Sequence, residues 1–126
     1  MATFNAKLGM GQQSLTDTSL EKLKAKANAG QLLCEFQAPR LVQGASPQEK
    51  ADRYKMIVDD RVCAKITRIY RGEDGHVYGD VEPHGPMSKT LKQMVDRGTT
   101  DNVIFGMRTI LKAGIADVIT YDLVHF

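Results

Sequence analysis

A predicted β-hairpin in the middle of the chain constrains the fold more than any other feature. The stretch Val62-Cys-Ala-Lys-Ile-Thr-Arg-Ile-Tyr70 is rich in β-forming residues, and apolar and polar side chains alternate from Ala64 onward. Gly72-Glu-Asp-Gly75 supplies turn-forming residues before a second stretch, His76-Val-Tyr-Gly-Asp-Val81. This order of two alternating segments around a glycine-rich turn is typical of an antiparallel strand pair.

Two capping motifs predict short helices. Thr18-Ser-Leu-Glu21 has the Ser/Thr-x-x-Glu pattern in which side chains satisfy the first amides of a helix, and Gly30 can end that helix in a left-handed conformation. We therefore expect a helix over 19–29. Ser46-Pro-Gln-Glu49 repeats the pattern with proline at the first helical position, which predicts a second helix over about 47–55.

A third helix and three further strands complete the expected architecture. Pro83-His-Gly-Pro86 interrupts the second hairpin strand, and Met87, Leu91, Met94 and Val95 then recur on one helical face until Gly98. The remaining apolar stretches rich in β-formers are 32–36, 102–110 and 117–124. The sequence therefore predicts an α+β fold, with a mixed, largely antiparallel five-stranded sheet or small barrel and about three short helices.

Size, charge and hydropathy describe one globular domain without naming a partner. The chain has 126 residues, 42% of them hydrophobic and 25% charged, which suits a single core. We expect an N-terminal arm over 1–16 and the domain over 17–126. A net charge of +2 is too small to indicate nucleic acid or an anionic membrane as a partner. No apolar run reaches the roughly 18 residues that span a bilayer, and no signal peptide is recognisable, so we expect the protein to stay in the compartment where it is made.

The potential metal ligands and nucleophiles do not form a recognisable set. The histidines, His76, His84 and His125, show no metal-binding spacing with each other or with cysteine, and we predict neither a metal nor another cofactor. Cys34 and Cys63 lie in apolar, strand-like stretches outside any Cys-x-x-Cys motif, which favours buried free thiols over a disulfide or a nucleophile. No phosphate-binding glycine motif occurs.

The segment His84-Gly-Pro-Met-Ser88 brings an imidazole and a hydroxyl close to the start of one helix. A hydrolase would also need an orienting acid and an oxyanion hole, and a serine at a helix start commonly acts as a cap. We therefore favour structural roles for His84 and Ser88. Of the acidic pairs Asp59-Asp60, Glu73-Asp74 and Asp80/Glu82, two lie at predicted turns, where aspartate caps amides and stays solvated, and we favour structural roles over acid–base catalysis or cation binding for all three.

Arg108 is the most unusual charged residue among the predicted strands. It stands within Ile104-Phe-Gly-Met-Arg-Thr-Ile110, where a charge must face solvent or find a carboxylate partner. Gly106, two positions earlier, indicates a bulge or the close approach of another backbone. Neither residue alone indicates a reaction.

Three segments occur in an order that a known family shares. Gly30-Gln-Leu-Leu-Cys-Glu-Phe-Gln-Ala-Pro-Arg40 is similar to a Gly-x-Leu-x-Gly-Glu-x-x-His-Pro stretch, and 61–95 looks like a strand pair followed by a helix. Asn102-Val-Ile-Phe-Gly-Met-Arg108 and 118–124 are similar to a segment holding a nucleophilic serine and to a terminal strand. Over about 17–124 the chain thus resembles the prohead maturation proteases of tailed bacteriophages, serine proteases of the T4 type that share an ancestry with herpesvirus assemblins.

The resemblance places two vacancies at the family's catalytic positions. Ala38 stands just before Pro39, where the family has its histidine, and Gly106 stands where the family has its serine. Losing the nucleophile or the base of a catalytic triad costs on the order of 10⁶ in turnover. The resemblance therefore implies a pseudoprotease on a prohead-protease-like domain.

The function implied by this resemblance is structural. We expect a non-catalytic, capsid-associated decoration, cement or head-assembly protein whose partner is the phage major capsid or scaffold protein. Self-association into a homo-oligomer stays open, and the expected location is the virion or, during assembly, the host cytoplasm. Two alternatives also stay open: an active prohead serine protease in which His84 or Ser88 stands in for a missing group, and a phage-encoded protein that sequesters a host factor.

Overall fold

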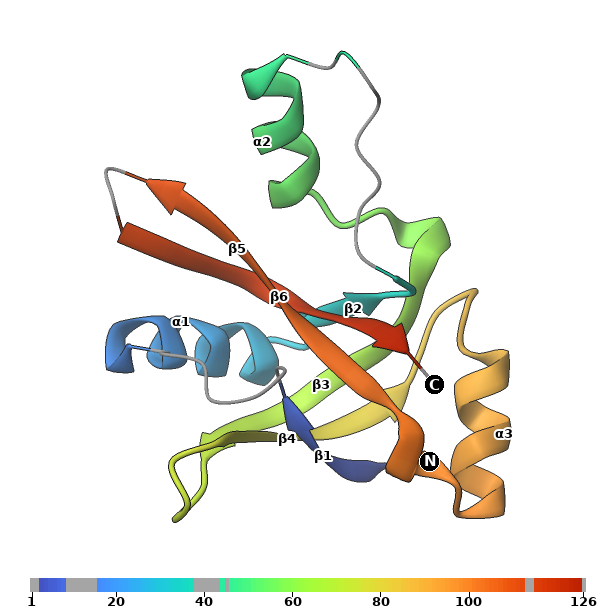
Figure 1. Cartoon of the computed structure of the whole chain (residues 1–126). Helices are drawn as coiled ribbons and strands as arrows, with labels where there is room; N and C mark the ends of the chain where they lie inside the picture. Colours follow the sequence, from blue (N-terminus) through green and yellow to red (C-terminus); the bar gives the residue numbers. More distant parts are fainter. Residues whose placement is uncertain (1–2, 9–15, 38–43, 45, 113–114, 126) are drawn as a thin grey trace.

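Six strands form one sheet that curls into a nearly closed barrel, with three short helices around it (Figure 1). The computed structural model describes residues 3–8, 16–37, 44, 46–112 and 115–125. The strands are β1 (Phe4–Leu8), β2 (Leu33–Glu35), β3 (Val62–Arg71), β4 (Val77–Pro83), β5 (Ile104–Lys112) and β6 (Ile115–His125). The helices are α1 (Asp17–Asn28), α2 (Pro47–Lys55) and α3 (Lys89–Arg97), with short 3-10 turns η1 (Asp59–Arg61) and η2 (Thr100–Asn102).

The strand order β2-β3-β4-β1-β5-β6 confirms an α+β fold with a largely antiparallel sheet. Neighbouring strands run antiparallel except β1 and β5, which pair in parallel at Leu8 and Phe105. The two ends of the sheet then meet, because Gln37 donates its N–H to the carbonyl oxygen of Leu123 at 2.6 Å. Thr120 adds a hydrogen bond from its hydroxyl to the Leu33 carbonyl oxygen at 2.7 Å. These contacts join β6 to the β2 segment.

The expected strand count of five is wrong, because β1 adds a sixth strand. It lies within the segment 1–16 that we expected to be an arm, and it fills the sheet position between β4 and β5. Phe4 and Ala6 are half-buried and Leu8 is buried, whereas Asn5 and Lys7 are exposed. This alternation is the period of a strand with one face on the core. This strand was not predicted from the sequence because it is short and because no pair of turn-forming residues links it to a neighbouring strand as a hairpin.

The core lies inside the curled sheet and beneath α1. Alternating residues of the strands supply most of its side chains, and α1 contributes Leu20, Leu23 and Ala27, all buried. The two thiols also belong to it. The strand residues that are buried here include Leu8, Cys34, Cys63, Ile66, Val81, Phe105, Tyr121 and Leu123.

Capping chemistry explains where the helices begin and end. The capping box predicted at Ser46 and Glu49 is present, and α2 covers 47–55 as expected. At α1 the predicted cap is wrong, because Thr16 rather than Thr18 accepts the hydrogen bond from the Ser19 amide, at 3.1 Å. Gly98 ends α3 with a φ of 68°, a left-handed conformation that suits glycine.

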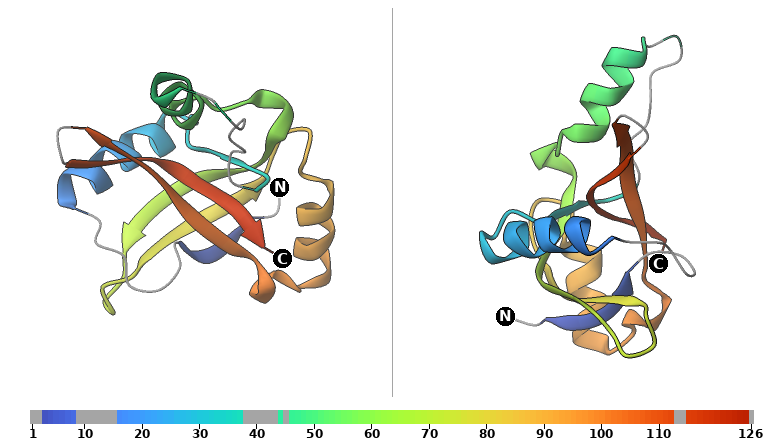
Figure 2. Two further views of the ribbon diagram at one scale, coloured as in Figure 1. Left: turned by 45° about the horizontal axis from the view of Figure 1, so that its top comes forward. Right: turned by 90° about the vertical axis from the view of Figure 1, so that its left-hand side faces the viewer.

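The apolar face expected for the third helix is only partly buried. Leu91 is buried and Met94 and Val95 are half-buried, but Met87 precedes α3 and is 41% exposed. In Figure 1 and Figure 2, α3 and α2 lie at different ends of the molecule. The region between them contains the end of β2, the start of β3 and the β5–β6 pair, and it holds Gly106, where the resemblance places a nucleophile.

Candidate functional site

Gly106, the position expected to hold the nucleophile of a prohead protease, is buried near the start of β5. It lies opposite Asp122 of β6 in the sheet register. Cross-strand partners share one face of a sheet, so a side chain at 106 would lie on the face that carries Asp122. A Cβ atom added at Gly106 would come within 3.1 Å of Val124 Cγ1. Val124 therefore already occupies part of the space that a serine side chain at position 106 would need.

Ala38, the position expected to hold the histidine, lies outside the described residues. Gln37, directly before it, bonds to Leu123 and has a φ of 65°, which is uncommon for a residue other than glycine. Leu123 adjoins Asp122, the partner of Gly106. Gln37 and Gly106 thus contact the same short stretch of β6, although they are far apart in the sequence.

Arg108 lies two residues beyond Gly106 and forms the centre of a buried charge cluster. Its Nε and Nη2 donate to the two carboxylate oxygens of Asp122, at 2.8 and 2.7 Å. Its Nη2 also lies 3.1 Å from Glu35 Oε2, and its Nη1 donates to the Met56 carbonyl oxygen at 2.9 Å. The side chains of Arg108, Glu35 and Asp122 are only 1%, 0% and 2% exposed. Of the two alternatives left open for Arg108, facing solvent or pairing with a carboxylate, the structure shows the second.

Glu35 connects this cluster to α2 and to the segment that follows it. Arg53 of α2 donates to both Glu35 oxygens, at 2.8 and 3.3 Å, and the Val58 amide donates to Oε2 at 3.1 Å. Arg61 lies farther away, at 3.6 Å. The bidentate geometry is the strongest that arginine and carboxylate can form. We call Glu35, Arg53, Arg61, Arg108 and Asp122 the Arg108 cluster; it fastens α2 to the barrel.

Burial and hydrogen bonding compete in setting the pKa of each central group. Burial raises the pKa of Glu35, but hydrogen bonds from Arg53, the Val58 amide and Arg108 outweigh it, so this pKa lies below its ordinary value. For Asp122 burial prevails, and its pKa lies above the ordinary value despite Arg108. Burial lowers the pKa of Arg108, but the bonds to Asp122 and Glu35 more than reverse this. An ionised carboxylate with a lowered pKa is a weak proton acceptor, so Glu35 suits a structural role better than general base catalysis.

His84 and Ser88, the expected stand-ins for missing catalytic groups, do not form a hydrogen-bonded pair. His84 is exposed just after β4, and its amide donates to the Cys63 carbonyl oxygen at 3.1 Å. Ser88 is buried at the N-cap of α3, and its carbonyl oxygen accepts from the Lys92 amide at 2.9 Å. Within the part of the chain that the structure describes, no hydrogen bond joins the His84 ring to the Ser88 hydroxyl.

The other serines that are described also lie at helix starts. Ser19 is in the first turn of α1, and the Ser46 hydroxyl accepts from the Glu49 amide at 3.2 Å. Ser14 lies outside the described residues. The Ser46 hydroxyl thus caps α2, whereas the Ser88 side chain makes no capping hydrogen bond at α3 and Thr16 rather than Ser19 caps α1.

The two cysteines are buried free thiols, as expected. The Cys63 thiol contacts the Cys34 carbonyl oxygen at 3.5 Å. Burial raises the pKa of Cys34 well above its ordinary value and the pKa of Cys63 to about 12. Because the thiolate is the reactive form, neither side chain has the properties of a nucleophile near neutral pH.

The acidic pairs are mostly at the surface, with one exception. Asp59, Asp60, Glu73 and Asp74 are exposed, as expected for groups at turns, whereas Asp80 is half-buried beside Arg68 and Glu82 is buried.

The histidines and carboxylates do not form a metal centre among the described residues. His76 lies in the turn just before β4 and is half-buried, and the side chain of His125 lies outside the described part of the chain. No group of three or more described His, Cys, Asp and Glu side chains is arranged to hold a metal ion.

Sequence reasoning identified Arg108 and missed its two central partners. Glu35 and Asp122 are acidic residues within otherwise apolar strands, Leu33–Glu35 and Ile115–His125. That is the same signal that singled out Arg108, since a charge in a buried strand needs an opposite charge nearby. Applying this criterion would have marked Glu35 and Asp122 as charges that need partners, although it would not have shown which residues pair.

The fold and this site define an α+β small-barrel domain in which a buried charge cluster lies beside Gly106, the position where the resemblance places a nucleophile. The family model described as the Peptidase S80 family matches residues 11–126, and the chain belongs to this family. The match confirms the expected prohead-protease-like family. No curated protein and no solved structure matches the chain significantly. The described helices include none that is long and apolar enough to cross a membrane.

Proposed function

We propose that the chain is a non-catalytic, capsid-associated structural protein of a bacteriophage, acting in decoration, cementing or assembly of the head. Gly106 is the observation that carries the proposal. It stands where the family resemblance places the nucleophilic serine, it has no side chain, and a Cβ atom added there would lie only 3.1 Å from Val124 Cγ1. A serine protease without its nucleophile loses about 10⁶ in turnover.

The remaining nucleophiles give further support. The described serines, Ser19, Ser46 and Ser88, lie at helix starts, and burial keeps the thiols of Cys34 and Cys63 protonated by raising the pKa of each. None of them has a histidine side chain as a hydrogen-bond partner among the described residues. A reaction at any of these groups would therefore need a rearrangement of the fold.

What the chain retains is a rigid scaffold with surface available for contacts. The Arg108 cluster fastens α2 to the barrel, while Met56, Met87 and Ile104 are 52%, 41% and 37% exposed. Met56 adjoins α2 and Met87 adjoins α3, at different ends of the molecule, so these side chains offer separate apolar contact points rather than one patch. The partner that fits the family is the major capsid or scaffold protein, met in the virion or in the host cytoplasm during assembly, and self-association is part of the proposal.

A direct test of catalysis uses the purified chain with the capsid and scaffold proteins of the same phage. Mass spectrometry should find no specific cleavage products, and a fluorophosphonate probe for activated serines should not label the chain. His84→Ala and Ser88→Ala serve as controls. Specific products that disappear in the Ser88→Ala variant would establish the active protease and overturn the proposal.

A second test separates a head protein from a protein that sequesters a host factor. Particles purified from infected cells on a density gradient should contain the chain, detected by peptide mass spectrometry. Recovery of the chain only in soluble fractions, bound to a host protein, would instead favour the sequestering function.

A further inference from the structure

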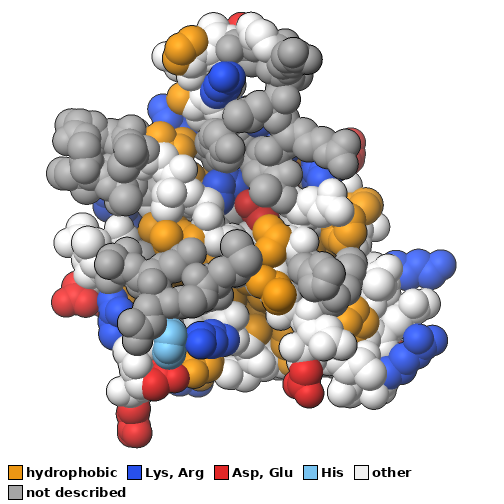
Figure 3. Space-filling view, viewed as in Figure 1, with side chains coloured by type: hydrophobic (Ala, Val, Ile, Leu, Met, Phe, Trp, Pro, Cys, Tyr) orange, Lys and Arg blue, Asp and Glu red, His pale blue; other side chains and the backbone are white. Residues whose placement is uncertain are grey.

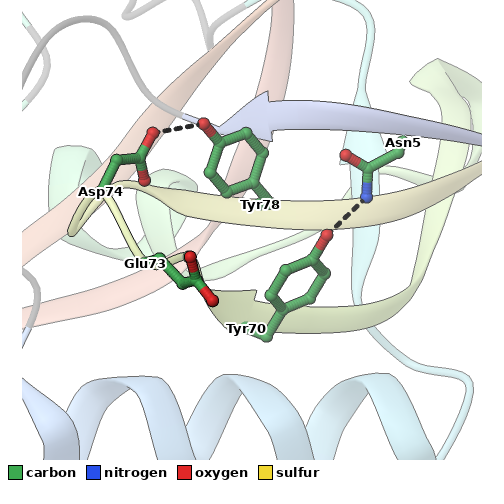
Figure 4. A pocket seen from close by; sticks show the side chains of 6 residues that line it. Asn5, Tyr70, Glu73, Asp74 and Tyr78 are labelled. Atoms are coloured by element: carbon green, nitrogen blue, oxygen red, sulfur yellow. Dashed lines mark hydrogen bonds between the residues drawn. The ribbon is translucent and has the colours of Figure 1, made fainter.

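A surface pocket lies on the β3–β4 hairpin, and its charged groups face solvent, unlike those of the Arg108 cluster. It has a volume of about 400 Å³ and is open to solvent (Figure 4). Its walls come from β1, from the facing strands of the hairpin and from the turn between them. The lining residues are Asn5, Tyr70, Gly72, Glu73, Asp74 and Tyr78.

Two aromatic rings form one wall of the pocket. Tyr70 and Tyr78 are direct partners in the register of β3 and β4, and their rings are stacked with centroids 6.0 Å apart and planes 22° apart. The Asn5 amide donates to the Tyr70 hydroxyl at 2.9 Å, and the Tyr78 hydroxyl donates to Asp74 Oδ2 at 2.6 Å (Figure 4). Both rings are therefore held in place from their hydroxyl ends.

Two carboxylates at the turn, Glu73 and Asp74, form no salt bridge with a described residue. Asp74 accepts hydrogen bonds from the Tyr78 hydroxyl and the His76 amide, and these bonds, with smaller Coulombic contributions from His76 and Lys7, hold the pKa of Asp74 below its ordinary value. Glu73 is exposed and forms no hydrogen bond or ion pair with any described residue. Lys7 on β1 forms no ion pair with either carboxylate. In Figure 3, the acidic side chains at the lower left, over the β3–β4 turn, lie beside a histidine and a Lys or Arg side chain.

The nearby arginines already have partners. Arg68 lies 3.8 Å from Asp80, and Arg71 lies 3.7 Å from Asp17 and donates to the Gly75 carbonyl oxygen at 3.4 Å. Arg68 also places its guanidinium 4.4 Å from the centroid of the Tyr70 ring. This is the cation–π geometry of a guanidinium on a tyrosine of this pair, and because Arg68 already occupies Tyr70, Tyr78 is the ring that a further guanidinium would meet.

Gly72 keeps the pocket open. A Cβ atom at this position would lie 2.7 Å from Tyr78 Cε1 and 3.0 Å from Asp74 Oδ1, too close for either side chain to remain where it is. Only glycine leaves both the ring and the carboxylate in their present positions. The shape of the pocket therefore depends on the residue type at 72.

We propose that this pocket binds the side chain of an arginine from a partner polypeptide, with the guanidinium against the Tyr70–Tyr78 pair and its N–H groups paired with Glu73 and Asp74. Arginine suits the site better than lysine, because a planar guanidinium can stack on a ring and bond to carboxylates at the same time. This binding is independent of whether the chain is catalytic. If the proposed head function holds, the arginine belongs to the capsid or scaffold partner.

The test is a nuclear magnetic resonance titration of the ¹⁵N-labelled chain with the peptide acetyl-Gly-Gly-Arg-Gly-Gly-amide. Saturable shifts are expected at the Gly72 amide and the Asn5 side-chain amide. The same peptide with citrulline, which has the shape of arginine without its charge, should bind several-fold more weakly. Equal binding of the two peptides, or shifts that map elsewhere, would overturn the proposal.

Variants make the assignment specific. Glu73→Gln should raise the dissociation constant of the arginine peptide roughly two- to fivefold, as expected for one exposed ion pair. Glu21→Gln, which neutralises an exposed glutamate on α1 paired with Lys24, should leave it unchanged. Gly72→Ala should displace Tyr78 and weaken binding while the chain still shows a folded spectrum. If neither Glu73→Gln nor Gly72→Ala changes the affinity, the pocket is not the binding site.

Discussion

The Arg108 cluster and the pocket on the β3–β4 hairpin, here called the hairpin pocket, both contain two carboxylates. Those of the cluster are buried and paired with arginine, and those of the pocket are exposed. In the cluster, Glu35 and Asp122 are almost fully buried and are bound by arginine at distances down to 2.7 Å. In the pocket, Glu73 and Asp74 are exposed, and no arginine among the described residues is paired with them. The first set of charges is complete within the fold, and the second set is open to a partner from outside.

This difference follows from the cost of removing a charge from water. A buried charge without a partner costs several kcal/mol, so the cluster can exist only if its bonds are made within the fold. At the surface, water solvates an unpaired carboxylate at little cost, and a partner from another molecule can replace that water. The buried set therefore supports stability, and the exposed set is available for recognition.

The largest expected effect is the loss of Arg108. Arg108→Met keeps an apolar stem but leaves Asp122 and Glu35 buried without their central cation, and we expect it to lower the free energy of unfolding by about 3–5 kcal/mol. Urea denaturation measures this. Arg68→Met is the matched control, because its ion pair with Asp80 at 3.8 Å is exposed, and it should cost less than about 1 kcal/mol. Similar losses for the two variants would contradict the comparison.

The next largest effect concerns pH. The contributions of Glu35 and Asp122 to the free energy of unfolding should change in opposite directions as the pH falls. The folded-state pKa of Glu35 is lowered, so its stabilising contribution is complete above the unfolded value of about 4.3 and is lost as pH falls through the folded value. The stability difference between the wild type and Glu35→Gln, about 2 kcal/mol at neutral pH, should therefore narrow as the pH is lowered from about 6 to 3.

Asp122 provides the internal control for this prediction. Its folded-state pKa is raised, so its ionised form is disfavoured in the fold, and lowering the pH removes that penalty. The stability difference between the wild type and Asp122→Asn should therefore widen over the same range. Thermal unfolding of the three proteins across the pH series measures both trends, and parallel trends would disprove the assignment of opposite shifts.

A smaller effect is expected for a side chain at Gly106. Gly106→Ser must push Val124 aside, and overpacking of this kind costs about 1 kcal/mol. Gly106→Ala has the same Cβ and should cost about the same, so a hydroxyl-specific effect would appear as a difference between the two. Thermal unfolding measures both. If Gly106→Ser instead raised the stability, the space around position 106 would be larger than the short contact with Val124 implies.

The predictability of each element depends on whether its cause is local in sequence. The second helix was predicted to its observed bounds, because Ser46, Pro47 and Glu49 contain the whole capping mechanism within one turn. The need of Arg108 for a carboxylate was also local, since it follows from one charge in an apolar strand. The identity of its partners was not local, because Asp122 lies 14 positions away on β6 and Glu35 lies on β2, at the other end of the strand order.

The same distinction explains what was missed at the surface. Asn5 reaches Tyr70 across 65 positions, through a strand that sequence analysis did not predict. The stacking of Tyr70 and Tyr78 depends on the register of the hairpin, which is shifted by an irregularity between Ile66 and Arg68. A one-residue change in register would move one ring to the other face of the sheet, so the pocket could not be derived from the predicted hairpin alone.

The smallest expected effect on stability is the most informative about function. Glu73→Gln changes an exposed side chain without a partner among the described residues, so the free energy of unfolding should stay within about 0.5 kcal/mol of the wild type. Glu35→Gln makes the same chemical change in the buried cluster and should be several times more costly. If urea denaturation shows this contrast while only Glu73→Gln weakens binding of the arginine peptide, the buried carboxylate acts in stability and the exposed one in binding. A large loss of stability in Glu73→Gln would mean that the turn depends on this carboxylate for its own fold, and the separation between the two regions would fail.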